Sequence, residues 1–399
     1  MLRIIVHDSL YLVIHMKKNI AILLFIVLIE GCTSGLSVVH NADDFVVVDL
    51  SHITDKTNRA IDEIVDSVQI IKLQTTDESL LSSSLKIEIS DKYIYVLDYR
   101  FGTVKIFTRD GFFFKNIAIG MGPGEINAPS IIRYVKNEEK LYICQDHLIN
   151  CYSADGKFLK DYHIPFFVDD FIKQGENFVC FQYARRAITH QTTIVEIDPN
   201  MKVISTFILE KERLIYGTNN LSINYKGDIN FFRPLDNNIY TYKDEEILLS
   251  KQLDFGCRDY DLKSLKSEID YQGFNNYAID HPEIFTLSDF YTETADYEMY
   301  RIGRGALLNF TTVFRNKKNG EIVETALSAM RKTNIINNLI YIGAYEDYFV
   351  AYCPLFKIAG ILDVAVENER TIPSDDIKIF KNMSDEDNPI LVLIKLKAN

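Results

Sequence analysis

Short apolar runs, alternating with polar residues, recur along this chain at a regular spacing. Residues 106–115 read IFTRDGFFFK and residues 151–160 read CYSADGKFLK, so an Asp-Gly pair separates two apolar runs twice, 45 positions apart. Asp-Gly between alternating runs is a strong β-hairpin signal, typical of a type I′ turn with positive φ at both central residues. The pattern therefore predicts two similar hairpins, over 103–117 and 149–164.

The same unit continues toward the C-terminus. Hairpins with turns at Pro199-Asn200 and Asp244-Glu245 follow at spacings of 44 and 45, and an insertion displaces a fifth hairpin to 308–327. Two further short strands are expected before each of the first four hairpins: 85–90 and 93–97, 131–136 and 140–144, 170–173 and 177–181, 221–225 and 228–232. Four strands every ~45 residues is the period of a β-propeller blade.

A sixth unit must be assembled from the two ends of the chain. Strands are expected at 339–342, 349–352 and 390–397, and the orphan strand 68–73 near the start completes this blade. Joining the termini in one blade closes the ring and removes exposed sheet edges. The sequence therefore predicts an all-β, six-bladed propeller of four-stranded antiparallel blades. Short helical insertions are expected over 260–280 and from Ser374.

The N-terminal residues have the pattern of a processing signal. Lys17 and Lys18 form a positive region, 20–29 is an apolar run of ten residues, and Glu30-Gly31-Cys32 follows it. A helix that spans a bilayer needs ~20 apolar residues, so this run is too short to cross as one. The alternative is one long anchor from Leu10 onward. We predict a lipoprotein signal over 1–31, with Met16 as an alternative start, and lipidation of Cys32. A linker is expected over 32–60 and the propeller over 61–399.

Three motifs resemble those of a known family. They are GMGPGE at 120–125, the terminal NPILV at 388–392, and FRP at 232–234 ahead of the strand that begins at 238. The chain from about 60 to 399 resembles the six-bladed β-propeller lipoproteins of Bacteroidetes, which are related to NHL-type propellers. The resemblance implies the fold and a place in the cell envelope, as an outer-membrane lipoprotein. It implies no catalytic residues.

Charge and cysteine content limit the kinds of partner. Removal of 1–31 leaves 40 basic and 54 acidic side chains, a net charge of −14, which excludes a nucleic-acid footprint because phosphate binding needs a basic stripe. Five cysteines remain, without the spacing of a zinc site. Cys144 and Cys151 could form a disulfide across one hairpin, but buried free thiols are the preferred interpretation. The GMGPGE stretch is interpreted as a turn between blades, because Pro123 removes a donor that a phosphate loop would need.

The loops between the second and third strands of the blades are rich in arginine. In a propeller these loops share one face with the connections between blades, so a ring of guanidinium groups is expected there, suited to carboxylates, sulfates or phosphates. The alternative is that each arginine pairs with an acid of a neighbouring blade. The residues of this hypothetical anion pocket are Arg100, Arg185, Arg186, Arg233 and Arg304, with Tyr99 and Tyr183 as stacking surfaces.

The sequence offers little support for catalysis. It has no recognisable Ser/His/Asp set and no H-E-x-x-H motif, and no Trp for sialidase-type boxes. We therefore predict an envelope-anchored, non-enzymatic binding or scaffold protein for an acidic glycan, a peptide or an envelope protein, with no cofactor. The alternative is a hydrolase or lyase that acts on sugar-derived or lactone substrates through loop carboxylates, with or without a divalent metal bound by them in the central channel.

Overall fold

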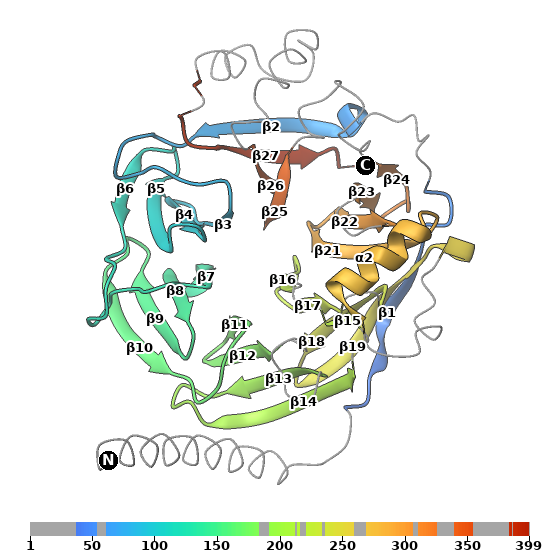
Figure 1. The fold of residues 1–399 in the computed structure, drawn as a ribbon, viewed down its shortest axis with the longest axis horizontal. Helices are drawn as coiled ribbons and strands as arrows, with labels where there is room; N and C mark the ends of the chain where they lie inside the picture. Colours follow the sequence, from blue (N-terminus) through green and yellow to red (C-terminus); the bar gives the residue numbers. More distant parts are fainter. Residues whose placement is uncertain are drawn as a thin grey trace, which may run out of the picture.

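Six β-sheets are arranged around a central axis (Figure 1). The computed structural model describes residues 37–53, 61–182, 191–211, 214–215, 221–233, 236–258, 269–305, 310–324, 339–353, 383–384 and 386–398. Each sheet is a blade, with its first strand nearest the axis and its fourth strand on the rim. The predicted six-bladed propeller is confirmed.

The strands of the first three blades lie close to the ranges that the apolar pattern predicts. Blade 1 contains β3 (Leu85–Ile89), β4 (Tyr93–Asp98), β5 (Thr103–Thr108) and β6 (Phe113–Asn116). Blade 2 contains β7 (Ile131–Val135), β8 (Lys140–Gln145), β9 (Leu148–Ser153) and β10 (Phe158–His163). Blade 3 contains β11 (Asp170–Gln174), β12 (Asn177–Gln182), β13 (Gln191–Ile197) and β14 (Val203–Lys211).

The other three blades complete the ring. Blade 4 contains β16 (Leu221–Ile223), β17 (Ile229–Phe232), β18 (Asn238–Lys243) and β19 (Glu246–Asp254). Blade 5 contains β21 (Phe285–Glu293), β22 (Tyr297–Arg304), β23 (Phe310–Asn316) and β24 (Ile322–Glu324). Blade 6 contains β25 (Ile340–Tyr345), β26 (Tyr348–Cys353), β27 (Ile390–Leu396) and β2 (Val65–Lys72). Because β2 pairs antiparallel with β27, the two ends of the chain close the ring as predicted.

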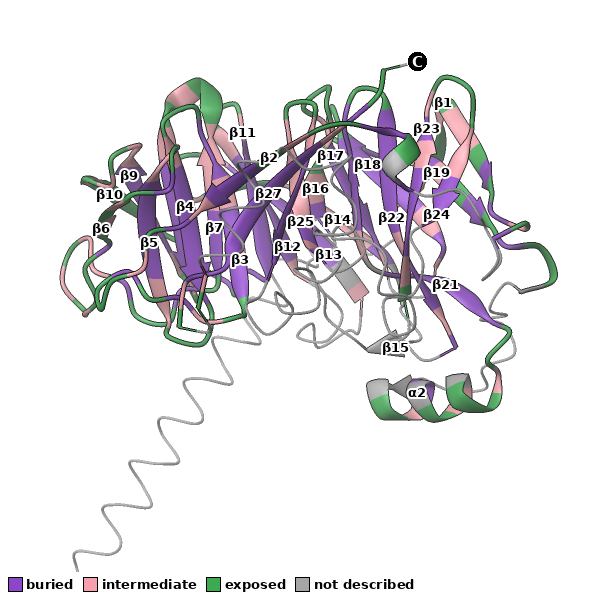
Figure 2. Ribbon diagram, turned by 90° about the horizontal axis from the view of Figure 1, so that it is seen from above, coloured by how far each residue is buried: buried purple, intermediate pink, exposed green. Residues whose placement is uncertain are grey.

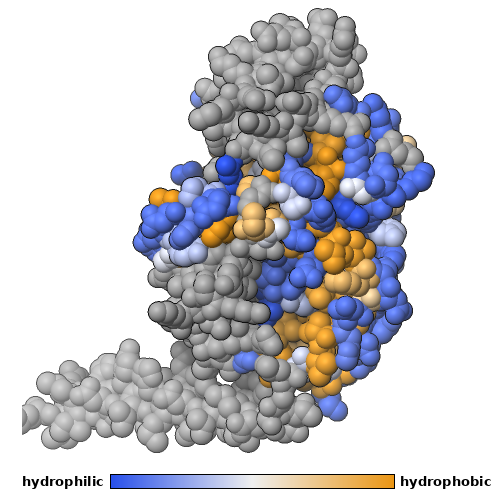
Figure 3. All heavy atoms as spheres, turned by 90° about the vertical axis from the view of Figure 1, so that its right-hand side faces the viewer, coloured by the Kyte–Doolittle hydropathy of each residue, from blue (hydrophilic) through white to orange (hydrophobic). Residues whose placement is uncertain are grey.

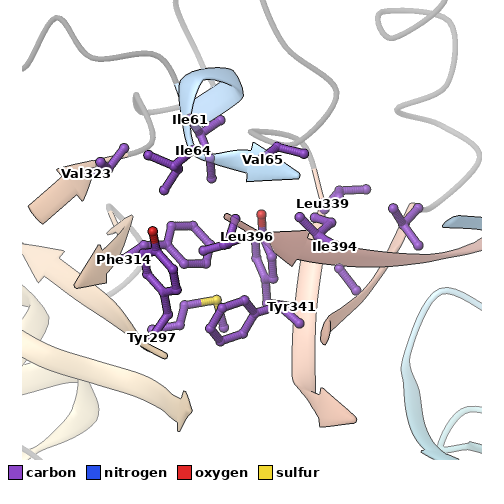
Figure 4. Packing of buried hydrophobic residues seen from close by; sticks show 14 of the residues in the cluster. Ile61, Ile64, Val65, Tyr297, Phe314, Val323, Leu339, Tyr341, Ile394 and Leu396 are labelled. Carbon is purple, nitrogen blue, oxygen red and sulfur yellow. The ribbon is translucent and has the colours of Figure 1, made fainter. Parts of the chain in front are cut away.

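The core lies between neighbouring blades, because alternate side chains of each strand point to the two faces of its sheet. Between blades 5 and 6, Tyr297 and Phe314 pack with Ile394 and Leu396, and the short 3-10 helix η1 (Ile61–Glu63) covers this cluster with Ile61 (Figure 4). Seen from the side, the strands are buried and most turns at their ends are exposed (Figure 2). Blade-to-blade packing of large apolar side chains therefore holds the ring together.

The Asp-Gly turns differ from the predicted turn type. Gly111 and Gly156 have φ of 88° and 74°, but the aspartates before them do not have positive φ. Each turn is followed by a shift in strand register, as in a type I turn with a glycine bulge. At Asp244-Glu245, by contrast, both central residues have positive φ, as a type I′ turn requires. The hairpins are correct, but the type I′ prediction for the Asp-Gly pairs is wrong.

Blade 4 has a fifth strand that the apolar pattern did not reveal. β1 (His40–Asp49) runs parallel to β19 along the rim, within the segment expected to be a linker. Val48 of β1 and the following Leu50 are buried in the core between blades 4 and 5. Figure 3 faces this side of the ring, where apolar surface lies among hydrophilic residues. The segment ahead of the propeller's predicted start is therefore held at the edge of blade 4.

The remaining elements are short. α2 (Tyr271–Asp280) lies within the helical insertion expected over 260–280, after the two-residue strand β20 (Ile269–Asp270), which pairs with β15 (Leu214–Ile215). The helix expected from Ser374 lies outside the described residues. Among the described helices, none has the length and apolar character needed to cross a membrane.

All five described cysteines are free thiols, and four of them are buried. Cys144 lies opposite Ile149 and Cys151 lies opposite Tyr142, so the two cysteines are not cross-strand partners. Burial, together with the nearby charge of Asp170, raises the pKa of Cys144 to about 12. The preferred interpretation of buried free thiols is consistent with this arrangement.

Candidate functional site

A cavity of about 870 Å³ opens at one end of the central channel. All six first strands line it, together with turns that connect first strands to second strands, among them Lys136, Gly175, Tyr225 and Glu346. We call this side of the ring the turn face, and the opposite side, which carries the loops between second and third strands, the loop face. The predicted arginine ring belongs to the loop face. The cavity therefore lies at the other end of the channel.

Arg133 forms the inner end of this cavity by bridging three blades. Its guanidinium group lies 2.6 Å from the carboxylate of Asp170 and 3.3 Å from that of Glu88, and its Nε donates to the carbonyl of Phe171 at 3.1 Å. Residues of β3, β7 and β11 are thereby joined across the channel. Because the Asp170 side chain has no exposed surface, this ion pair is shielded from water.

Lys86 adds a second cation behind this ion pair. Its ammonium group lies 3.9 Å from the carboxylate of Asp170. Burial, and then the positive charge of Arg133, lower the pKa of Lys86 to about 8, against the opposing effect of the two carboxylates. Burial also raises the pKa of Glu88, although Arg133 acts in the other direction. Desolvation therefore outweighs pairing for both groups.

An exposed group of charges crosses the rim of the cavity between blades 6, 1 and 2. Lys136 lies 2.8 Å from the carboxylate of Glu346 and 3.4 Å from that of Asp91, and the Tyr345 hydroxyl donates to Asp91 at 2.7 Å. The hydrogen bond from Tyr345, followed by the charge of Lys136, lowers the pKa of Asp91. One cation thus serves two carboxylates, and the rim keeps hydrogen-bond acceptors open to solvent.

On the other side of the cavity, blade 4 presents an aromatic and an aliphatic side chain. Tyr225 is 51% exposed and Ile223 is 47% exposed. The ammonium group of Lys317 lies 4.1 Å from the centre of the Tyr225 ring, which supports the ring through a cation–π contact. In blade 2, Tyr134 lines the cavity with its ring stacked on Tyr95 at 5.3 Å. The wall therefore offers aromatic surface that other residues hold in place.

Glycines keep part of this cavity open. Gly175, Gly227 and Gly343 line it, and a Cβ atom added at any of them would meet no other atom within 4 Å. Gly175 and Gly227 have positive φ, but Gly343 does not. A side chain at Gly343 would therefore enter the cavity without backbone strain.

A buried set of charges joins blades 4 and 5 beside the cavity. Glu293 lies 3.2 Å from Lys317 and 3.5 Å from Lys251, and Glu298 lies 2.9 Å from Arg315. The Tyr291 hydroxyl donates to Glu293 at 2.7 Å. Since both carboxylates are almost fully buried and fully paired, we assign this group to the attachment of the two blades.

The structure tests the expected loop-face residues only in part. Tyr183, Arg185 and Arg186 lie outside the described residues, as does Cys32. Tyr99 and Arg100 are exposed, and within the described part of the chain no acid pairs with the Arg100 guanidinium.

The other two loop-face arginines contact residues of their own blades. Arg233 pairs with Asp236 at 2.6 Å and donates to the Tyr240 hydroxyl at 3.1 Å. This acid belongs to the same blade, whereas the pairing alternative expected an acid of a neighbouring blade. Arg304 lies over the ring of Phe285, 5.8 Å from its centre.

The GMGPGE segment is a turn between blades, as predicted. It connects β6 to β7, and a bridge between Ile119 and Ile126 closes it. The Glu125 carboxylate accepts from the Gly122 amide at 2.8 Å. At Gly124, with φ of 74°, an added Cβ would lie 2.5 Å from the ring of Phe158. Glycine at this position is explained by packing against blade 2.

Metal chemistry finds no support in the described part of the chain, where no three His, Cys, Asp or Glu side chains are grouped as metal ligands. His147 stacks against Phe167, with 3.9 Å between ring centres, and His281 lies 3.2 Å from Glu283 at the surface. The geometry of the cavity instead suits the binding of a molecule by aromatic contact and hydrogen bonds.

The sequence did not reveal the cavity, because its lining residues come from six separate segments between 87 and 350. A usable signal is the short polar turn after each first strand, such as Lys136-Asn137 after β7 and Glu346-Asp347 after β25. These turns carry the exposed groups that meet at the axis.

Residues 45–395 match a family described as a domain of unknown function, DUF4934. None of the curated proteins is similar enough to match this chain. Among solved structures, BF0058 of Bacteroides fragilis NCTC 9343, an inferred exported protein, superposes with a TM-score of 0.70 at 19% identity, covering 88% of this chain and 100% of its own. A DUF4221 family member from Bacteroides vulgatus ATCC 8482 gives 0.47 at 12% identity, covering 84% and 97%. At these identities the likeness concerns the fold.

Proposed function

This chain belongs to the DUF4934 family, and we propose that it is an extracytoplasmic, non-enzymatic binding protein whose ligand enters the cavity on the turn face. The observation that carries the proposal is the cavity itself. It has a volume of about 870 Å³, within the range of small-molecule sites, and all six blades contribute to it. The first strands of all six blades therefore build this site together.

The chemistry of the lining supports binding over turnover. Among the described residues, three cations line the cavity and each has an acidic partner, namely Asp170 for Arg133, Glu346 for Lys136 and Glu138 for Lys173. A general acid or base, or a nucleophile, is normally placed beside a group that activates it. Here the paired charges bridge blades and hold the cavity walls in place.

The N-terminal pattern supports a position at the cell envelope. Lys17, Lys18 and the apolar run 20–29 precede Gly31-Cys32, as in a lipoprotein signal. We propose that a lipid on Cys32 holds the propeller at the outer membrane. On the loop face, Arg100, Arg185 and Arg186 are proposed as contacts for an acidic group of a glycan, a peptide or an envelope protein.

The test is a ligand screen on the mature chain with Cys32→Ser, using thermal stability as readout and glycans, peptides and divalent metals as probes. We expect a stabilising probe whose effect is reduced in Gly343→Phe, because the new ring takes up part of the cavity without backbone strain. The matched control is Ile204→Phe, on the outer strand of blade 3, where the side chain is already 46% exposed. A probe that stabilises Gly343→Phe as well as the parent binds elsewhere and contradicts the proposal.

A further inference from the structure

We infer that the ligand of the turn-face cavity is a neutral oligosaccharide, bound with one sugar ring stacked on Tyr225. This inference rests on the proposed function and gives it a ligand class. Three features of the cavity carry it: a supported aromatic face, cations that are already neutralised, and exposed hydrogen-bond acceptors on the rim.

Tyr225 offers an aromatic face that the protein holds in position. Lys317 lies 4.1 Å from its ring centre and is itself fixed by Glu293 at 3.2 Å, yet about half of Tyr225 remains exposed. Ile223, two residues earlier, is also exposed and extends the apolar surface. Sugar rings present one apolar face of C–H groups, which packs against an aromatic ring and removes it from water. An exposed, rigid tyrosine in a concave site fits such a partner.

The electrostatics of the cavity do not favour an anion. Every cation that the described part of the chain contributes to its lining is paired, and Arg133 is shared between Asp170 and Glu88. The lining contains four acids, which are Glu88, Glu293, Glu346 and Asp347. An acidic ligand would meet no uncompensated positive charge here and would lose hydration on entry.

The rim suits a ligand with many hydroxyl groups. The side chains of Asp91, Glu346 and Asp347 are 69%, 54% and 57% exposed, and carboxylates accept hydrogen bonds from hydroxyls. Lys136 lies between the first two and can donate to a sugar oxygen. A hydrogen-bond donor, Lys136, and the carboxylate acceptors thus lie together at the opening of the cavity, across from the Tyr225 ring. A neutral polyhydroxyl chain uses both without disturbing the ion pairs.

The experiment is isothermal titration of the mature chain with neutral tetrasaccharides (of glucose, xylose, mannose and N-acetylglucosamine), tetragalacturonate, and tetralysine. We expect a neutral tetrasaccharide to bind, with a Kd that changes less than about threefold between about 0.05 and about 0.5 M salt. Tyr225→Ala should weaken it at least about tenfold, while Tyr225→Phe, which keeps the ring, should stay within about threefold. Melting temperatures of both variants check that the fold is retained.

The outcomes separate this inference from the proposed function. If only tetragalacturonate or tetralysine binds, and Gly343→Phe weakens that binding, the ligand class is wrong but the binding site stands. If a neutral sugar binds and Tyr225→Ala leaves its Kd unchanged, the stacking role is overturned. If no neutral sugar binds, the inference is overturned. If the probes that do bind are unaffected by Gly343→Phe, the proposed function is overturned as well.

Discussion

The clearest test of how the ring closes is removal of the Asn388 side chain. Asn388 lies just before β27 and is fully buried. Its Oδ1 accepts from the Leu81 amide at 2.8 Å, and its Nδ2 donates to the carbonyls of Gln74 and Ser79 at 2.8 and 2.9 Å. These groups lie in the segment that connects β2 of blade 6 to β3 of blade 1. One carboxamide therefore ties the C-terminal strand to the first blade.

The size of the effect follows from what Asn388→Ala leaves behind. The Leu81 amide and the Ser79 carbonyl lose this partner in buried surroundings, and each buried unsatisfied group costs about 1–3 kcal/mol. The Gln74 carbonyl keeps a second donor, the Ser79 hydroxyl at 2.7 Å. We therefore expect the free energy of unfolding to fall by about 3 kcal/mol.

The assay is urea denaturation of the mature chain, with Asn150→Ala as the matched control. Asn150 is also buried, but its side chain makes one hydrogen bond, to the Glu125 carbonyl at 3.2 Å, so its removal should cost about 1 kcal/mol. Hydrogen exchange should show faster exchange in β2 and β27 for Asn388→Ala than for the control. Equal stability losses in the two variants, or unchanged exchange in these strands, would refute the closing role.

Two further predictions concern the charges at the inner end of the cavity. Arg133→Met should lower the free energy of unfolding, measured by urea denaturation, by about 3–5 kcal/mol, because it leaves the fully buried Asp170 carboxylate without its closest cation. The double variant Arg133→Met, Asp170→Asn should recover part of this loss, because the buried carboxylate is then replaced by a neutral amide. A loss below about 1 kcal/mol would show that Asp170 is satisfied without Arg133. The pKa of Lys86 is 10.5 in the unfolded chain and about 8 in the folded protein, so below pH 8 the folded protein must hold a charged ammonium group in buried surroundings. Lys86→Met removes this cost and should therefore raise the free energy of unfolding most below pH 8. That advantage should shrink as pH rises from 8 to 10.5, by at most about 3 kcal/mol, and a pH-independent difference between the two proteins would contradict it.

The amino-acid sequence by itself determined the propeller and the closure of its ring. Blades are local units, so an apolar alternation and a turn every ~45 residues specify each one without reference to the others. The same local pattern predicted strands at 390–397 and 68–73 that had no partner nearby in the sequence. Pairing them with each other was inferred because a closed ring leaves no exposed sheet edge. Asp110-Gly111 also marked its hairpin correctly, although the turn type depended on a register shift that the pattern does not carry.

Only the tertiary structure decided the rest. β1 pairs with β19, some 200 residues away, and its first half, HNADD, is mostly polar, so no local pattern identifies it as a strand. Arg233 was expected to face a ligand, but Asp236, three residues later, folds back onto it. The cavity forms where six first strands converge, bringing Tyr225, Arg133 and Gly343 around one axis. A binding site made by the convergence of distant segments has no signature in sequence spacing, because the distances between its residues are set by the closure of the ring.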